Sequence, residues 1–274
     1  MYALKSAQRL SRAVRVEWED GLTAQFTYVW LRDNGYKRPS LLHLDLHAKP
    51  EAVKNTDNNL SVVWPPFLQA QYSSQFLREH ASIKPKKIVC PASERVMKVP
   101  WRVQERPRDN NSGHMAAMLW SDRAVECGTV WPHFERVPSI VTVETNQPSA
   151  QIYVVDALAA CTTMAEQFPE QFKFLVDNPV EYEDGLFKAT HRTIEVQDGK
   201  VVSAVFNNDL RSSEITTEML DMMYLSLKTL NKLVCDHTTT LLLQPSEMLV
   251  VDNSQAFLGC PPQTDRRLYL RLFH

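Results

Sequence analysis

The stretch Phe26-Thr27-Tyr28-Val29-Trp30-Leu31-Arg32-Asp33-Asn34 sets the organisation of the N-terminal part of this chain. It continues an alternation of apolar and polar side chains that runs through 14–18 and 23–29, on either side of Asp20-Gly21. Alternation that flanks an Asp-Gly pair predicts a β-hairpin. Residues 60–64 predict a further strand and 70–80 a short helix. These elements predict a small N-terminal β domain over residues 1–80.

The same stretch, with Val-Glu-Trp-Glu-Asp-Gly at 16–21, resembles the small N-terminal domain of the γ-butyrobetaine hydroxylase and trimethyllysine dioxygenase family. These are TauD-like 2-oxoglutarate-dependent Fe(II) dioxygenases. Further similarity follows in family order at 154–158, 168–170, 178–180, 199–208 and 249–253. The resemblance implies a mixed, β-rich fold, in which the small N-terminal β domain is joined to a reduced double-stranded β-helix (jelly-roll) domain with flanking helices.

The remaining pattern completes this division of the chain. Residues 81–128 are predicted to be an irregular linker or arm, and 129–274 the degenerate dioxygenase-like jelly-roll domain. Apolar spacing predicts helices at 156–168, 170–176 and 213–235, and strands at 140–143, 152–155, 193–196, 201–206, 238–243, 247–251 and 268–273. The methionine-rich face of 213–235 is interpreted as core, although methionine also suits adaptable partner surfaces.

The resemblance also says where iron is expected. Non-haem iron of this class takes two histidines and one carboxylate on one face and leaves positions open for 2-oxoglutarate and oxygen. In family register the His-x-Asp pair falls on Gly128 and Val130, and the distal histidine falls on Leu258. None of these three residues has a metal-binding side chain, so the resemblance implies a degenerate member without catalytic or metal-binding residues at these positions.

Other functional residues of the family are also missing from this chain. The structural zinc that follows the Trp-Leu-Arg-Asp-Asn motif needs cysteines, but residues 35–39 contain none. An aromatic residue of the trimethylammonium cage falls on Leu272, which cannot offer cation–π attraction. The arginine that pairs with the 2-oxoglutarate carboxylate resembles Arg266, or Arg267 in a shifted register, and is a remnant carboxylate site.

These losses predict a catalytically inactive, dioxygenase-like protein that uses no cofactor, is not an enzyme, and serves as a structural or interaction subunit of a larger protein assembly. The alternative is a 2-oxoglutarate-dependent oxygenase or carboxylate-binding sensor with an atypical metal site, for which the candidate ligands are His114, His133, His191 and His237. A third cluster, His43-Leu44-Asp45-Leu46-His47, suits a metal in principle, but its alternation with leucine is that of an amphipathic strand.

Composition narrows the remaining classes of function. A net charge of −2 gives no indication of a nucleic-acid partner, and no run of apolar residues is long enough for a transmembrane span. Five widely spaced cysteines without a Cys-x-x-Cys pair favour a reducing compartment. Residues 1–16 contain basic and apolar residues but no acid, a pattern that favours a mitochondrial targeting segment. The alternative is that the segment is a short basic strand or helix, in which case the protein is expected in the cytoplasm.

Overall fold

The computed structural model describes residues 2–35, 38–83, 101–105, 115–116, 124–145, 149–262 and 268–273. The chain forms two compact units. The first contains residues 1–86 and 213–228, and the second contains 87–212 and 229–274. The sequence had predicted boundaries at 80 and 128, and it did not place any part of the 213–235 helix with the N-terminal domain.

The first unit begins with a three-stranded antiparallel sheet of β1 (Leu4–Arg9), β2 (Ala13–Trp18) and β3 (Thr23–Thr27). The predicted hairpin around Asp20-Gly21 is confirmed, and Gly21 has a φ of 85°, which a glycine adopts without strain. Strand β3 ends earlier than predicted, because Thr27 caps helix α1 (Tyr28–Asp33) by accepting a hydrogen bond from the Trp30 amide. The basic N-terminal segment, residues 1–16, contributes β1 and the first part of β2 to this sheet.

A second antiparallel sheet of three strands follows, formed by β4 (Ala52–Asn55), β5 (Asn59–Trp64) and β6 (Leu68–Ser73). The 3-10 turn η1 (Leu41–His43) precedes it, and helix α2 (Ser74–Glu79) follows it. The helix predicted at 70–80 is therefore wrong for its first residues. They belong to a strand, and the side chain of Ser73 caps the helix at the Phe76 amide.

Trp30 joins the parts of the first unit. Its ring is 1% exposed and stacks between Phe26 and Phe76, with centroid distances of 5.2 and 5.7 Å. Its indole Nε1 donates a hydrogen bond to the Ser213 carbonyl at 3.1 Å. Nearby, the Tyr224 hydroxyl donates to the buried Asp33 carboxylate at 2.8 Å. These contacts explain why residues 213–228 pack with the N-terminal strands.

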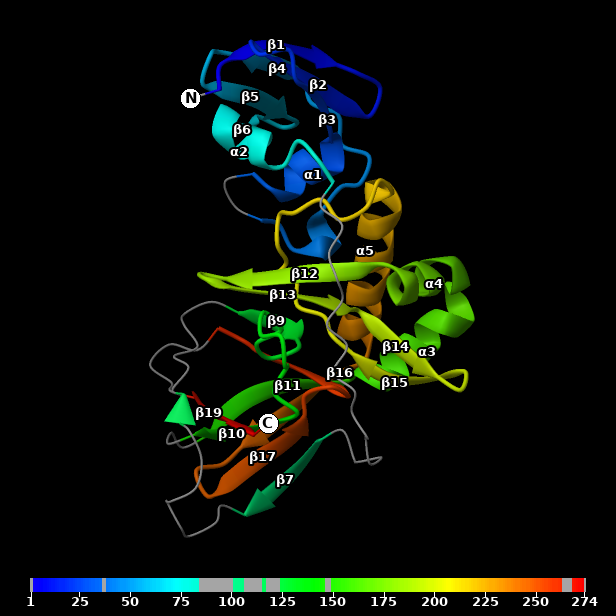
Figure 1. Cartoon of the computed structure of the whole chain (residues 1–274). Helices are drawn as coiled ribbons and strands as arrows, with labels where there is room; N and C mark the ends of the chain where they lie inside the picture. Colours follow the sequence, from blue (N-terminus) through cyan, green and yellow to red (C-terminus); the bar gives the residue numbers. More distant parts are fainter. Residues whose placement is uncertain are drawn as a thin grey trace. The chain divides into compact units, whose positions relative to one another are not determined.

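The two larger sheets of the second unit are antiparallel (Figure 1). One has the order β7-β17-β10-β19-β8, and the other has the order β16-β11-β18-β9. Their strands are β7 (Trp101–Glu105), β8 (Met115–Ala116), β9 (Val125–Gly128), β10 (Ile140–Thr145), β11 (Ala150–Asp156), β16 (Thr238–Leu243), β17 (Glu247–Asp252), β18 (Ala256–Cys260) and β19 (Leu268–Phe273). From β8 to β11 and from β16 to β19 consecutive strands alternate between the two sheets, which is the connectivity of a jelly roll.

A long insertion separates β11 from β16. It contains helices α3 (Ala157–Gln167) and α4 (Pro169–Asp177), the hairpins β12 (Pro179–Asp184)–β13 (Phe187–Arg192) and β14 (Ile194–Gln197)–β15 (Lys200–Ala204), and helix α5 (Leu220–Asp236). Helices α3 and α4 pack against the β14–β15 hairpin (Figure 1). The strands predicted at 193–196 and 201–206 are confirmed, and they pair as a hairpin around Asp198-Gly199. Among the described residues, no helix is both long and apolar enough to cross a membrane.

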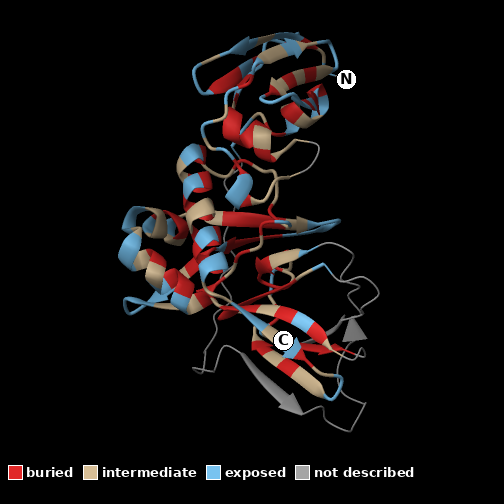
Figure 2. Ribbon diagram, turned by 180° about the vertical axis from the view of Figure 1, so that it is seen from behind, coloured by how far each residue is buried: buried red, intermediate tan, exposed pale blue. Residues whose placement is uncertain are grey.

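The core of the jelly roll lies between the two sheets. Val141 and Val143 of β10 face inward from one sheet, and Ile152 and Val154 of β11 face inward from the other. Inward residues recur at every second position, as expected of strands with one buried face, and they appear as red bands in Figure 2. The predicted fold class, a β-rich chain with a jelly-roll domain and flanking helices, is confirmed.

Candidate functional site

The three positions where the resemblance places iron ligands meet in the structure. Gly128 at the end of β9 is the direct cross-strand partner of Leu258 in β18. Val130 follows two residues later and belongs to the same buried cluster as Leu258, with exposed fractions of 7% and 2%. Residues separated by more than a hundred positions along the chain therefore lie together, in the arrangement that the family register implies.

The side chains at this point do not fit an iron ion. Glycine, valine and leucine offer no donor atom, and apart from Cys260 the buried residues that form the cluster with Val130 and Leu258 have hydrocarbon side chains. A Cβ atom built on Gly128 would lie 2.7 Å from the Phe206 carbonyl oxygen, which is closer than real Cβ contacts come. The backbone of β9 thus has no room for an imidazole at this position, and the interior of the jelly roll is filled by packed hydrocarbon.

The loop that follows β9 is nevertheless held firmly. The side chain of Asn253, which is fully buried, accepts from the Val130 amide at 2.9 Å and donates to the carbonyls of Val130 and Pro138 at 2.9 and 3.0 Å. Thr129 is held on the other side, since its amide donates to Phe206 O at 2.6 Å and its hydroxyl accepts from the Phe206 amide at 3.0 Å. The Asp-Asn element noted in the sequence therefore positions this loop.

This loop carries a buried imidazole. His133 is 4% exposed, and its Nδ1 has no hydrogen-bond partner among the described residues. Its ring packs against Phe134 and Phe187, with centroid distances of 4.6 and 6.3 Å. Burial lowers the pKa of His133, so that the neutral form, which is the form that binds metals, is favoured. Trp131, two residues earlier, has a φ of 56°, a left-handed conformation that is strained for a bulky side chain.

His191 on β13 lies against the same loop. Its Nε2 lies 3.0 Å from the Phe134 carbonyl oxygen, to which the ring donates when that nitrogen carries the proton. Burial lowers the pKa of His191, while the carbonyls of Phe134 and Pro132 oppose that effect. His191 therefore holds residues 132–134 in place through their backbone carbonyls, and this structural role explains why it is buried.

The other predicted candidates are scattered. Both nitrogens of His237 are engaged, Nδ1 with the Leu233 carbonyl at 2.8 Å and Nε2 with the Thr163 hydroxyl at 3.3 Å. His43 and His47 are exposed, and they lie in a 3-10 turn and the loop after it, where the sequence had suggested a strand. His114, Arg266 and Arg267 lie outside the described residues. Across the described ranges no three His, Cys, Asp or Glu side chains converge as a metal site.

The sequence identifies His133 as one of four candidate ligands, but it does not reveal the hydrogen bonds that hold the loop around His133. Nothing in the sequence links Asn253 to Val130 or His191 to Phe134, because these pairs are brought together by strand pairing between distant segments. The one local signal is the stretch 249–253, which ends in Asp252-Asn253 and resembles the family. The resemblance does not indicate which groups Asn253 contacts.

A scan of protein-family models finds no match to this chain. Among solved structures, the chain resembles the non-heme iron oxygenase OrfP in complex with Fe and alpha-ketoglutaric acid, at 11% identity and a TM-score of 0.44, over 56% of this chain and 50% of that one. It also resembles an asparagine oxygenase in complex with Fe(II), 3-hydroxyasparagine and succinate, at 14% identity and a TM-score of 0.43, over 55% and 50%. A protein described as an alpha-ketoglutarate-dependent taurine dioxygenase from Burkholderia xenovorans matches at 14% identity and a TM-score of 0.45, over 64% and 61%. The chain thus spans little more than half the length of these proteins, and the comparison concerns the fold alone.

The comparison overturns one prediction. From the missing ligands, the sequence predicts a chain that is not an enzyme, but the solved structures that it resembles are described as oxygenases or dioxygenases, two of them with Fe and with alpha-ketoglutaric acid or succinate bound. That prediction is wrong. It rested on the loss of the iron ligands at Gly128, Val130 and Leu258, together with the missing zinc cysteines and cage aromatic, whereas an imidazole or carboxylate elsewhere in the same fold can also bind a metal.

The protein is expected to become less stable as the pH is lowered, because of these buried histidines. Since burial lowers the pKa of His191 in the folded state, the unfolded chain binds more protons below its ordinary pKa of about 6.5. The free energy of unfolding should therefore decrease as the pH falls from about 6.5 toward the lower folded-state value. Urea denaturation in the presence of a chelator, over a pH series, measures this dependence.

The matched variant is His191→Gln, which keeps an N–H donor for the Phe134 carbonyl but cannot titrate. Its stability should depend less steeply on pH than that of the wild type over the same range. Equal slopes for the two proteins would show that His191 does not contribute to the acid sensitivity.

Proposed function

We propose that the protein is a 2-oxoglutarate-dependent oxygenase with an atypical metal site, to which the loop after β9 contributes His133. The observation that carries the proposal is the place and state of this imidazole. It is buried and favoured in its neutral form, and one of its nitrogens has no hydrogen bond to any residue that the structure describes. It follows by three residues the point where the family register expects iron ligands. A buried polar group without a partner is uncommon and calls for a ligand or a chemical role.

Two features of the same loop support the proposal. Asn253 fixes the loop by three hydrogen bonds to backbone groups, so that His133 is presented from a rigid frame. The left-handed conformation of Trp131 stores backbone strain next to it, and such strain is concentrated at functional sites.

The carboxylate co-substrate is assigned to Arg266 on the strength of the sequence resemblance. A guanidinium can bind the carboxylate of 2-oxoglutarate through two parallel hydrogen bonds. Arg267 is the alternative in a register shifted by one residue, which makes it the natural matched variant. Membership of a larger, mitochondrial assembly stays a prediction of the sequence, and native mass spectrometry of the protein isolated from its source tests it.

The decisive experiment is turnover by the full chain. Purified protein with Fe(II), 2-oxoglutarate and oxygen is expected to release succinate and consume oxygen above a boiled control. His133→Ala should lower both metal content and succinate release by at least about tenfold. His237→Ala is the matched control, because both nitrogens of His237 already have hydrogen-bond partners, and it should keep both readouts.

Ligand binding gives a second readout that is independent of turnover. 2-Oxoglutarate should raise the melting temperature of the wild type, since a ligand that binds only the folded state stabilises it. Arg266→Met should abolish this rise and Arg267→Met should leave it in place. Succinate release at the level of the boiled control would contradict the oxygenase, and stabilisation by 2-oxoglutarate in that same protein would then identify a carboxylate sensor.

A further inference from the structure

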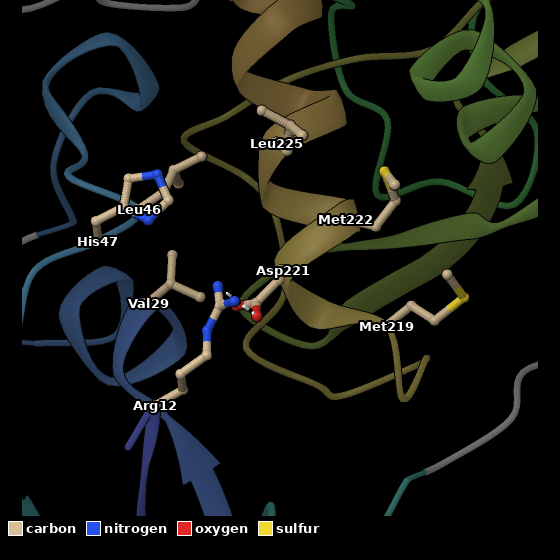
Figure 3. A pocket seen from close by; sticks show the side chains of 8 residues that line it. All are labelled: Arg12, Val29, Leu46, His47, Met219, Asp221, Met222 and Leu225. Atoms are coloured by element: carbon tan, nitrogen blue, oxygen red, sulfur yellow. Dashed lines mark ion pairs between the residues drawn. The ribbon is translucent and has the colours of Figure 1, made fainter.

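The first unit contains two adjoining cavities that the oxygenase fold does not explain. Their volumes are about 380 and 420 Å³, within the range of roughly 300–1,000 Å³ that small-molecule sites occupy. They share five lining residues, so they form one continuous groove (Figure 3): Arg12, Val29, Leu46, His47 and Asp221. The groove lies between helix α1, the loop after η1 and the start of helix α5.

One end of the groove is apolar. Met222 and Leu225 of α5, the preceding Met219 and Val29 of α1 line it, and all four are drawn in Figure 3. Met219 is 56% exposed and Leu225 38%, although both belong to the apolar face that the sequence assigns to the core. Flexible methionine side chains fill irregular spaces and suit a surface that adapts to what binds it.

The other end is polar and positively charged. Arg12 and Lys49 contribute two fixed cations, His47 contributes an imidazole, and Asp221 contributes the one carboxylate of the lining. Arg12 and Asp221 form an ion pair at 2.8 Å, with side chains that are 63% and 45% exposed. An ion pair this exposed contributes little to stability, so the guanidinium can bind another carboxylate at small loss.

We propose that this groove binds an acidic amphiphile, a carboxylate with an unbranched alkyl chain. The alkyl chain lies along Val29, Met222 and Leu225, and the carboxylate binds at Arg12 and Lys49. The chemical class of the ligand follows from the combination of an apolar end and a cationic end in one groove. An apolar channel alone accepts any hydrocarbon, whereas the cationic end selects a negatively charged head group. The Arg12–Asp221 pair sets the affinity, since Asp221 competes with the ligand for the guanidinium.

Isothermal titration calorimetry of the full chain with decanoate, below its micelle-forming concentration, tests the proposal. Decanoate should bind with one site per chain. Octanoate, which is two methylenes shorter, should bind more weakly by about fifteenfold, because each buried methylene tightens binding about fourfold. Decyltrimethylammonium, which has the same chain and the opposite charge, should not bind. Equal affinity for the two decyl compounds, or no heat with decanoate up to about 1 mM, would overturn the proposal.

Variants of the ion pair give opposite signs, which a general loss of folding cannot imitate. Arg12→Gln should weaken decanoate binding at least fivefold, an order of magnitude typical of one charge-assisted hydrogen bond. Asp221→Asn should tighten it, because the guanidinium is released. Arg15→Gln is the matched control, since Arg15 is exposed on the same hairpin and does not line the groove. Binding unchanged by both Arg12→Gln and Asp221→Asn would refute the site.

Discussion

Replacing Trp30 by alanine will lower the free energy of unfolding by about 3–5 kcal/mol, the loss typical of a buried tryptophan. The indole is 1% exposed and stacks on Phe26 and Phe76, so alanine leaves a cavity between strand β3 and helix α2. The substitution also removes the N–H that reaches the Ser213 carbonyl at 3.1 Å. Urea denaturation followed by circular dichroism measures the total loss.

Trp30→Phe separates these two contributions, because phenylalanine keeps most of the stacking and loses the hydrogen bond. We expect a loss of about 1–3 kcal/mol for this variant, the range for a buried acceptor left unpaired. Hydrogen–deuterium exchange adds an internal control, since peptides of the first unit should exchange faster and those of strands β10 and β11 should not. A loss below about 1 kcal/mol for Trp30→Ala would show that this ring is not the centre of the first unit.

Placing the family's distal histidine into this chain, as Leu258→His, will lower the free energy of unfolding by about 2–5 kcal/mol. Leu258 is 2% exposed inside the cluster between the two sheets. The change removes leucine packing and leaves imidazole nitrogens among side chains that cannot hydrogen-bond them. The loss is measured by urea denaturation at a pH near 8, where the imidazole is neutral and the result reports packing.

Leu242→His is the matched control for this experiment. Leu242 lies in strand β16 of the same sheet, but it is 57% exposed, and its substitution should change stability by no more than about 0.5 kcal/mol. If Leu258→His were as stable as Leu242→His, the interior would be able to accept a polar ligand. A histidine at position 128, which the family's two-histidine, one-carboxylate iron site also needs, would still clash with the backbone. A Cβ atom built on Gly128 would lie 2.7 Å from the Phe206 carbonyl oxygen.

The sequence predicted best where structure depends on neighbouring residues. The hairpins at Asp20-Gly21 and Asp198-Gly199 were found because the turn chemistry and the flanking alternation are local. Errors arose where side-chain caps decide a boundary. Thr27 ends a strand and begins helix α1, and Ser73 does the same for helix α2, although apolar periodicity alone runs on past both.

The candidate site shows the same division. The sequence could name His133 and the three positions that lack ligands, because residue identity and family register require no coordinates. It could not show that His133 is buried with a free nitrogen, or that Asn253 and His191 hold its loop. Those facts depend on which strands pair, and pairing between distant segments leaves no local pattern in the chain.

By itself, the sequence determined the local turns and the chemical content of each position, since these follow from turn residues and side-chain type. Its resemblance to a known family implied the β-rich jelly-roll class. Only the tertiary structure decided that residues 213–228 pack with the N-terminal strands through Trp30 and Asp33, and that Gly128 lies opposite Leu258. It also created the groove at Arg12 and Asp221. The physical reason is that such contacts gain their free energy from surfaces buried between segments far apart in the chain, and no short stretch of sequence records which segments those are.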